Sequence, residues 1–99
     1  MRAVYKEPGK LPEIIDVEST LEALQEKVGG YIETLTFASD ACIICNEEGR
    51  ILELPYNCEF LGLDFFGPIL VVGVAGEEFE SLSVAMACAV EIELRRRLI

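Results

Sequence analysis

Four cysteines are the side chains in this sequence with the most evident chemistry, and two of them form a CxxC motif. The motif is Cys42-Ile-Ile-Cys45, and Cys58 and Cys88 follow it. A CxxC pair can bind zinc or carry out thiol–disulfide exchange. A zinc site needs a second pair or histidines at matching spacing, and the chain has no histidine. We interpret the cysteines as structural, with zinc binding and redox chemistry as the alternatives.

The residues around the motif support that interpretation. Ala41 to Cys45 is an apolar run of strand length, and positions three apart in a strand face opposite sides of a sheet. A redox CxxC usually opens a helix, where the dipole lowers the thiol pKa. The two thiols are therefore expected to point away from each other.

Other catalytic arrangements are equally hard to find. Without histidine, a Ser–His or Cys–His nucleophile pair is impossible. Carboxylates are abundant, but their spacing indicates turns and helix faces rather than an acid–base pair. We expect a protein that is not an enzyme and that has no metal and no cofactor. A metal-dependent hydrolase with Asp and Glu ligands is the alternative that stays open.

Charge is the strongest compositional signal, because 18 acidic residues stand against 8 basic ones. From residue 11 to residue 94 only Lys27 and Arg50 are basic, against 17 acids, which gives this segment a net charge of −15. Such a surface repels nucleic acid and anionic membranes and attracts a basic protein. Solubility alone is the simpler explanation. The acids expected to meet a basic partner are Glu22, Glu26, Glu33, Glu47, Glu48, Glu53, Glu77 and Glu78.

The length and hydropathy predict one domain over residues 1–99. The chain contains no run of eighteen apolar residues, so no membrane span is predicted. The first ten residues lack the apolar segment of a signal peptide. We therefore expect a cytoplasmic protein. The fold class expected is α+β, with a small, mostly antiparallel sheet, a short helix at about 19–28 and a longer C-terminal helix at about 81–97.

The short helix has clear boundary signals. Ser19 is suited to be its N-cap, and Glu22 three residues later completes a capping box. Leu21, Leu24 and Val28 share one face. Gly29 or Gly30 can end the helix in the left-handed conformation, and a strand is expected to start at Tyr31.

The other elements are assigned from alternation, turn residues and composition. Residues 3–5 and 13–17 predict an N-terminal hairpin, and 41–45 with 50–54 predict a second one. Residues 58–66 favour a short helical turn or an irregular loop, and 68–74 a central strand. The C-terminal helix is apolar nearly all round, which indicates burial on more than one side. It is therefore a candidate homodimer helix through Val84, Met86 and Val90.

Three stretches resemble a known family: EPGK near the N-terminus, TLEALQEKVGGYIE, and ICNEEGRILELPYN followed by GPILVVGV. From about Met1 to Gly76 the chain is similar to small proteins of bacteria, phages and plasmids that form a domain of unknown function. The resemblance implies an α+β fold and a mobile-element setting, often near genes that counter host defence. It implies no catalytic residues. The apolar C-terminal helix departs from the more polar ending usual in that family.

These signals together suggest two kinds of function. The first is an acidic interaction protein, a nucleic-acid mimic of a phage or mobile element that inhibits a host defence protein of the CRISPR or restriction type. The alternative is a small-molecule or nucleotide-sequestering module. Its site would combine the double glycine with Tyr31, Tyr56 and Asn57. A purely structural dimer is a third hypothesis.

Overall fold

The protein is described by a computed structural model that covers residues 1–97. Its helices and strands follow one another as β1 (Arg2–Lys6), β2 (Glu13–Asp16), α1 (Leu21–Val28), β3 (Ile32–Ala38), β4 (Ala41–Asn46), β5 (Tyr56–Phe60), β6 (Leu63–Phe66), β7 (Ile69–Ala75), β8 (Glu78–Glu80) and α2 (Val84–Arg96). All strand pairs are antiparallel. The predicted α+β class with a short and a C-terminal helix is confirmed. Within the described residues, neither helix is long and apolar enough to cross a bilayer.

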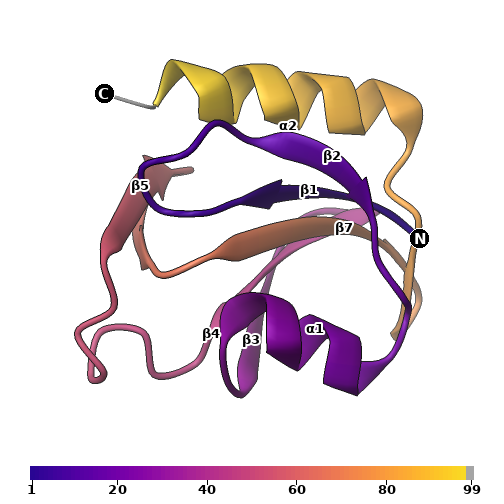
Figure 1. Cartoon of the computed structure of the whole chain (residues 1–99). Coiled ribbons are helices and arrows are strands. Elements are labelled where there is room, and N and C mark those ends of the chain that lie inside the picture. The colour runs from indigo at the N-terminus through magenta and orange to yellow at the C-terminus, as the bar shows by residue number, and fades with distance from the viewer. Residues whose placement is uncertain (98–99) are drawn as a thin grey trace.

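A six-stranded sheet forms the centre of the molecule, with strand order β2-β1-β7-β4-β3 and β8 beside β7. Helix α2 lies on one face and α1 on the other (Figure 1). The prediction of a central strand is confirmed by β7, whose side chains are buried on both faces. Ile69 and Val71 pack toward α2, and Leu70 and Val72 pack toward α1. This two-sided burial explains the near-continuous apolar run.

Helix α1 begins one residue later than the predicted N-cap Ser19 would place it. Thr20, not Ser19, is the N-cap, and its Oγ1 accepts a hydrogen bond from the Ala23 amide at 3.2 Å. Glu22 is therefore not at the third helical position, and the predicted capping box is wrong. Gly29 ends the helix at φ 81°, as the sequence predicts, and its amide donates to the Gln25 carbonyl. Spacing alone could not choose between two adjacent hydroxyls.

The predicted hairpin of 41–45 with 50–54 is wrong. Strand β4 pairs with β3 on one side and with β7 on the other, so neither edge is left for another strand. Residues 47–54 instead form successive turns, in which the Leu52 amide donates to the Glu48 carbonyl and the Leu54 amide to the Gly49 carbonyl. The real partner of β4 in a hairpin is β3, joined to it through Ser39 and Asp40.

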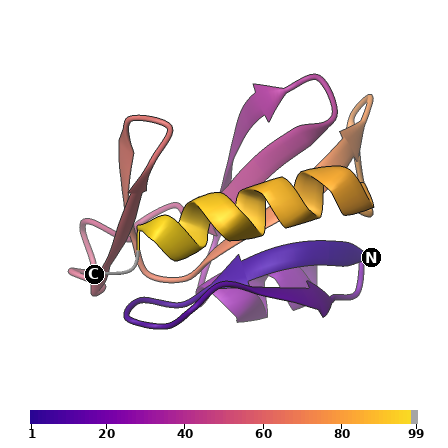
Figure 2. The same ribbon diagram turned by 90° about the horizontal axis from the view of Figure 1, so that it is seen from above.

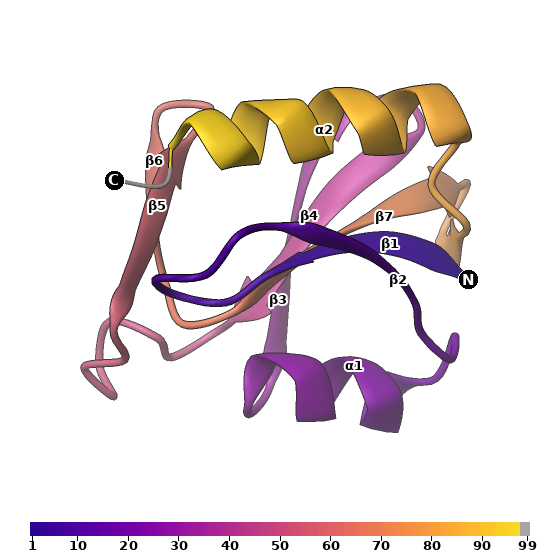
Figure 3. The same ribbon diagram turned by 45° about the horizontal axis from the view of Figure 1, so that its top comes forward.

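A second correction concerns residues 58–66, which form the hairpin β5–β6 and not a loop or helical turn. Its turn residues Leu61 and Gly62 both have positive φ, 56° and 78°, as a two-residue hairpin turn of type I′ requires. Phe60 and Phe65 are buried in the same core cluster as α2. The hairpin stands beside the C-terminal end of α2 (Figure 3).

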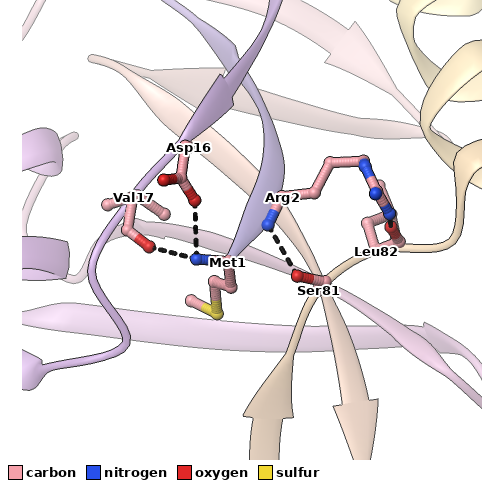
Figure 4. A network of polar contacts seen from close by, with 6 residues as sticks. All are labelled: Met1, Arg2, Asp16, Val17, Ser81 and Leu82. Carbon is pink, nitrogen blue, oxygen red and sulfur yellow. Dashed lines mark hydrogen bonds and ion pairs between the residues drawn. The ribbon is translucent and has the colours of Figure 1, made fainter.

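The N-terminal strand fixes the start of α2 over the sheet (Figure 4). The predicted N-terminal hairpin is confirmed as β1–β2. The Arg2 guanidinium donates to the Leu82 carbonyl at 2.8 Å, and the Arg2 amide donates to Ser81 Oγ at 2.8 Å. On the other side, the Met1 nitrogen donates to Asp16 Oδ1 at 2.9 Å. These contacts tie the N-terminus, the end of β2 and the segment before α2 to one corner of the sheet.

Helix α2 lies across the sheet, as the view from above shows (Figure 2). Ser83 caps it, with Oγ accepting from the Met86 amide at 3.1 Å. Ala87, Val90 and Leu94 are buried against the sheet. The opposite face is exposed within the described chain, so burial on more than one side is not seen in a single copy. Its exposed residues include Val84, Ala85, Cys88, Ala89 and Ile92.

Candidate functional site: an acidic groove beside strand β3

A groove of about 320 Å³ separates the main sheet from the hairpin β5–β6. It lies on the α2 side of the sheet, because Leu35, Cys45 and Phe65 belong to or pack against the core cluster on that side. We call it the acidic groove. It is lined by Glu33, Leu35, Cys45, Asn46, Glu47, Gly49, Arg50, Leu63, Asp64, Phe65 and Phe66.

Three carboxylates from three different segments surround the groove. Glu33 comes from β3, Glu47 from the turn after β4, and Asp64 from β6, and all three are exposed. The only basic side chain among the lining residues, Arg50, stacks on Phe66 with its guanidinium carbon 4.5 Å from the ring centroid. The lining therefore has more negative than positive charge, with an apolar floor. Such a surface suits a cationic, partly apolar ligand.

Cys45 lies in the groove but is not poised for chemistry. Its thiol contacts Glu33 Oε1 at 3.9 Å. Burial first, and then the neighbouring Glu33 carboxylate, raise the pKa of the Cys45 thiol to about 11. The thiol is therefore protonated at neutral pH and a poor nucleophile. Cys42 belongs to the core cluster on the other face of the sheet, which confirms that the two CxxC thiols point in opposite directions.

Asn46 holds the end of β4, helix α1 and the following turn together. Its Nδ2 donates to the Val28 carbonyl at 3.1 Å, and its Oδ1 accepts from the Glu48 amide at 2.8 Å. A Cβ at Gly30 would lie 2.9 Å from Asn46 Nδ2. The second glycine of the pair is therefore explained by this close packing.

Strand β3 forms one edge of the sheet, and its outward backbone groups can be assigned from the register. The Tyr31 carbonyl accepts a hydrogen bond from the Glu47 amide at 2.9 Å, so this pair occupies a hydrogen-bonded position of the ladder. Pairs alternate in an antiparallel ladder. The N–H and C=O groups of Ile32, Thr34 and Thr36 therefore point away from β4, toward the open edge. No strand of residues 1–97 pairs with that edge.

The comparison with protein families gives one match. The model described as a domain of unknown function, DUF3846, matches residues 1–95. The chain belongs to this family. The match reaches into α2, beyond the resemblance that the sequence analysis placed at about Met1 to Gly76. Neither the search of curated proteins nor the search of solved structures found a match.

The eight acids named from the sequence are all exposed, but they do not form one patch. Glu33 and Glu47 line the acidic groove, and Glu48 lines a neighbouring hollow that shares Asn46 with it. Glu22 and Glu26 lie on α1, and Glu53 lies in the turns after β4. Glu77 and Glu78 lie at the opposite end of the sheet, because β4 and β7 run antiparallel and Ala41 pairs with Gly73.

The residues named for a dimer helix and for a small-molecule site are also dispersed. Val84 is exposed, Met86 is half-buried, and Val90 is buried in the core of the same chain. Tyr31 lines the neighbouring hollow of about 280 Å³ with the double glycine. Tyr56 instead donates to Asp64 Oδ1 at 2.9 Å, and Asn57 is buried. The small-molecule module stays a prediction.

Asp64 and Lys6 were missed by the sequence analysis. Asp64 faces the groove because the β5–β6 hairpin folds back over the sheet, and the alternation of Cys58 and Phe60 with Glu59 was the available signal for that hairpin. Lys6 has no exposed surface, and burial lowers the pKa of its ammonium. Nothing in the local sequence distinguishes it from a surface lysine. Among residues 1–97, no cluster of three or more Cys, Asp or Glu side chains could hold a metal ion.

Proposed function

We propose that the protein is a non-enzymatic acidic interaction protein of a phage or mobile element, located in the cytoplasm. It inhibits a host defence protein, of the CRISPR or restriction type, by occupying a basic surface that binds nucleic acid. The observation that supports this most is the arrangement around the acidic groove. There Glu33, Glu47 and Asp64 come together from three segments, with Arg50 turned onto Phe66.

The remaining charge supports the same proposal. Residues 11–94 carry 17 acids and two basic residues, and a surface of this kind is steered toward basic partners and away from nucleic acid. Nucleic-acid-guided nucleases hold their guide and target in positively charged channels. The acidic protein would compete with the nucleic acid of such a nuclease for that channel.

The test measures binding and inhibition of a guide-RNA-dependent nuclease, with and without its guide, at rising salt concentration. Tight binding to the guide-free nuclease that weakens steeply with salt is expected, together with loss of DNA cleavage. Reversal of Glu47 and Glu48 to lysine should weaken binding more than reversal of Glu77 and Glu78. The two double variants change the net charge equally, so they separate a contact from a long-range effect. Affinity that ignores both salt and all four reversals would contradict the proposal.

A further inference from the structure

The open edge of β3 and the acidic groove lie side by side, so one ligand can contact both. Glu33 and Leu35 contribute their side chains to the groove. The intervening residue, Thr34, and its neighbours Ile32 and Thr36 direct their backbone groups to the edge. A polypeptide lying along this edge would therefore find backbone partners and a side-chain pocket at the same time.

We propose that β3 accepts an extended basic segment of a partner protein as an additional antiparallel strand. The backbone groups of Ile32, Thr34 and Thr36 provide the hydrogen bonds, as in other complexes formed by strand addition. Side chains of the added strand alternate between the two faces. Those on the groove face lie beside Glu33 and Leu35, which favours a lysine or arginine next to an apolar residue.

Charge decides which strand can occupy the edge. A second copy of this chain would bring another surface with a net charge of −10 to the groove, and like charges placed across a ladder are unfavourable. Edge strands are often protected by lysine, proline or a covering segment. Strand β3 contains no lysine and no proline, and only Glu33 is charged. The edge therefore disfavours self-association and leaves a basic segment as the suitable occupant.

This inference rests on the proposed function in assuming a basic protein as partner, and it adds how that partner is held. It also makes the backbone of β3 as important as the carboxylates. Salt should weaken the interaction without abolishing it, because the backbone hydrogen bonds and the apolar contact with Leu35 are little affected by screening.

The experiment uses a labelled synthetic peptide, Lys-Thr-Val-Thr-Lys-Thr, and fluorescence anisotropy at low ionic strength. The wild-type protein should bind it, and the same peptide with glutamate in place of lysine should not. Thr34→Pro removes one outward N–H without touching the ladder to β4, and is expected to weaken binding at least about fivefold. Thr34→Val keeps the N–H and serves as the matched control, with affinity unchanged.

Two further measurements keep the test decisive if Thr34→Pro fails to fold. The amides of the peptide's threonines face β3 when its lysine and valine side chains lie on the groove face. The same peptide with N-methyl groups on those threonine amides cannot add as a strand in this register and should not bind. Hydrogen exchange of the wild-type Thr34 and Thr36 amides should slow when the parent peptide binds. Absence of peptide binding, or equal affinity of the methylated peptide with unprotected Thr34 and Thr36, would overturn strand addition.

The two proposals fail separately. Strand addition fails, and the proposed function survives, if the nuclease binds Thr34→Pro and the wild type equally while reversal of Glu47 and Glu48 weakens binding. The proposed function fails, and strand addition survives, if the basic peptide protects Thr34 and Thr36 while no defence nuclease is inhibited.

Discussion

Lys6 and Asn57 hold β1 and the hairpin β5–β6 together through reciprocal hydrogen bonds in the protein interior. Lys6 Nζ donates to Asn57 Oδ1 at 2.8 Å, and Asn57 Nδ2 donates to the Lys6 carbonyl and to the Gly67 carbonyl, each at 2.8 Å. Lys6 has no exposed surface, and it forms no ion pair with a carboxylate of residues 1–97. The position of the hairpin, and with it one wall of the acidic groove, depends on this pair.

Removing one member of this pair should be costly. Asn57→Ala leaves the Lys6 ammonium with the Glu7 carbonyl at 3.3 Å as its remaining partner. We expect a loss of about 3 kcal/mol in the free energy of unfolding, measured by urea denaturation. The double variant Lys6→Met with Asn57→Leu should recover much of that loss, because it leaves no buried charge. A double variant as unstable as the sum of the two single variants would contradict this account.

The buried thiols make the protein less stable in alkaline solution. Burial raises the pKa of the Cys42 thiol, and burial together with the Glu33 carboxylate raises that of Cys45, each to about 11 from an ordinary value of 9.0. Between these values the unfolded chain releases protons that the folded chain keeps, so the free energy of unfolding should fall as pH rises from about 9 to about 11.

The lowered pKa of Lys6 acts in the opposite direction, because the unfolded chain then binds the extra proton. Urea midpoints at a series of pH values, for the wild type and for Cys42→Ala, measure the slope. Cys42→Ala should show a shallower fall with pH. Equal slopes for the two proteins would argue against the Cys42 thiol as a cause.

The turn of hairpin β5–β6 contains a residue whose type does not suit its conformation. Leu61 has φ 56°, and a leucine in the left-handed region costs about 1 kcal/mol relative to asparagine or glycine. Its side chain is 52% exposed, so little burial is lost by replacement. Leu61→Asn is expected to stabilise the protein by about 0.5–1 kcal/mol, measured by denaturation. Leu61→Val, with a branched Cβ, should destabilise it, and the reverse order would exclude backbone strain at this position.

The first turn of α1 distinguishes between two adjacent hydroxyl groups. Thr20 Oγ1 accepts the Ala23 amide. Thr20→Ala should therefore lower stability by about 1 kcal/mol, the usual effect of losing an N-cap. Ser19→Ala, the matched change one residue earlier, should be neutral within about 0.5 kcal/mol. Thermal or urea unfolding of the two variants is sufficient, and a larger effect from Ser19→Ala would show that the helix starts earlier.

The fold was predictable where the local sequence pattern matches the packing that a segment has in the folded protein. Ile69 to Val72 are apolar without interruption because both faces of β7 are covered, and that pattern is visible in the sequence. Gly29 ends α1 by local conformation alone. The segment 50–54 has a comparable apolar pattern, yet β4 already pairs with β3 and β7. Which strands pair with β4 depends on segments distant in the sequence, so the local pattern of residues 50–54 could not predict it.

The acidic groove was predictable only in part. Glu33 and Glu47 were expected to be exposed acids, and exposure follows from charge. Their proximity to Asp64 depends on the hairpin β5–β6, whose turn residue Leu61 lacks the asparagine or aspartate that usually marks a type I′ turn. The outward direction of the Thr34 backbone depends on the register with β4. Both facts require the partner strand to be known.

The strand order also sets a time at which the protein can begin to fold during its synthesis. Val4 pairs with Val71, so β1 cannot take its place between β2 and β7 until residue 71 has been synthesised. At translation rates of about 5–20 residues per second, the N-terminal hairpin stays without this partner for several seconds. During that interval its apolar residues are open to chaperones and to other nascent chains, whereas the β3–β4 hairpin can form as soon as it is synthesised.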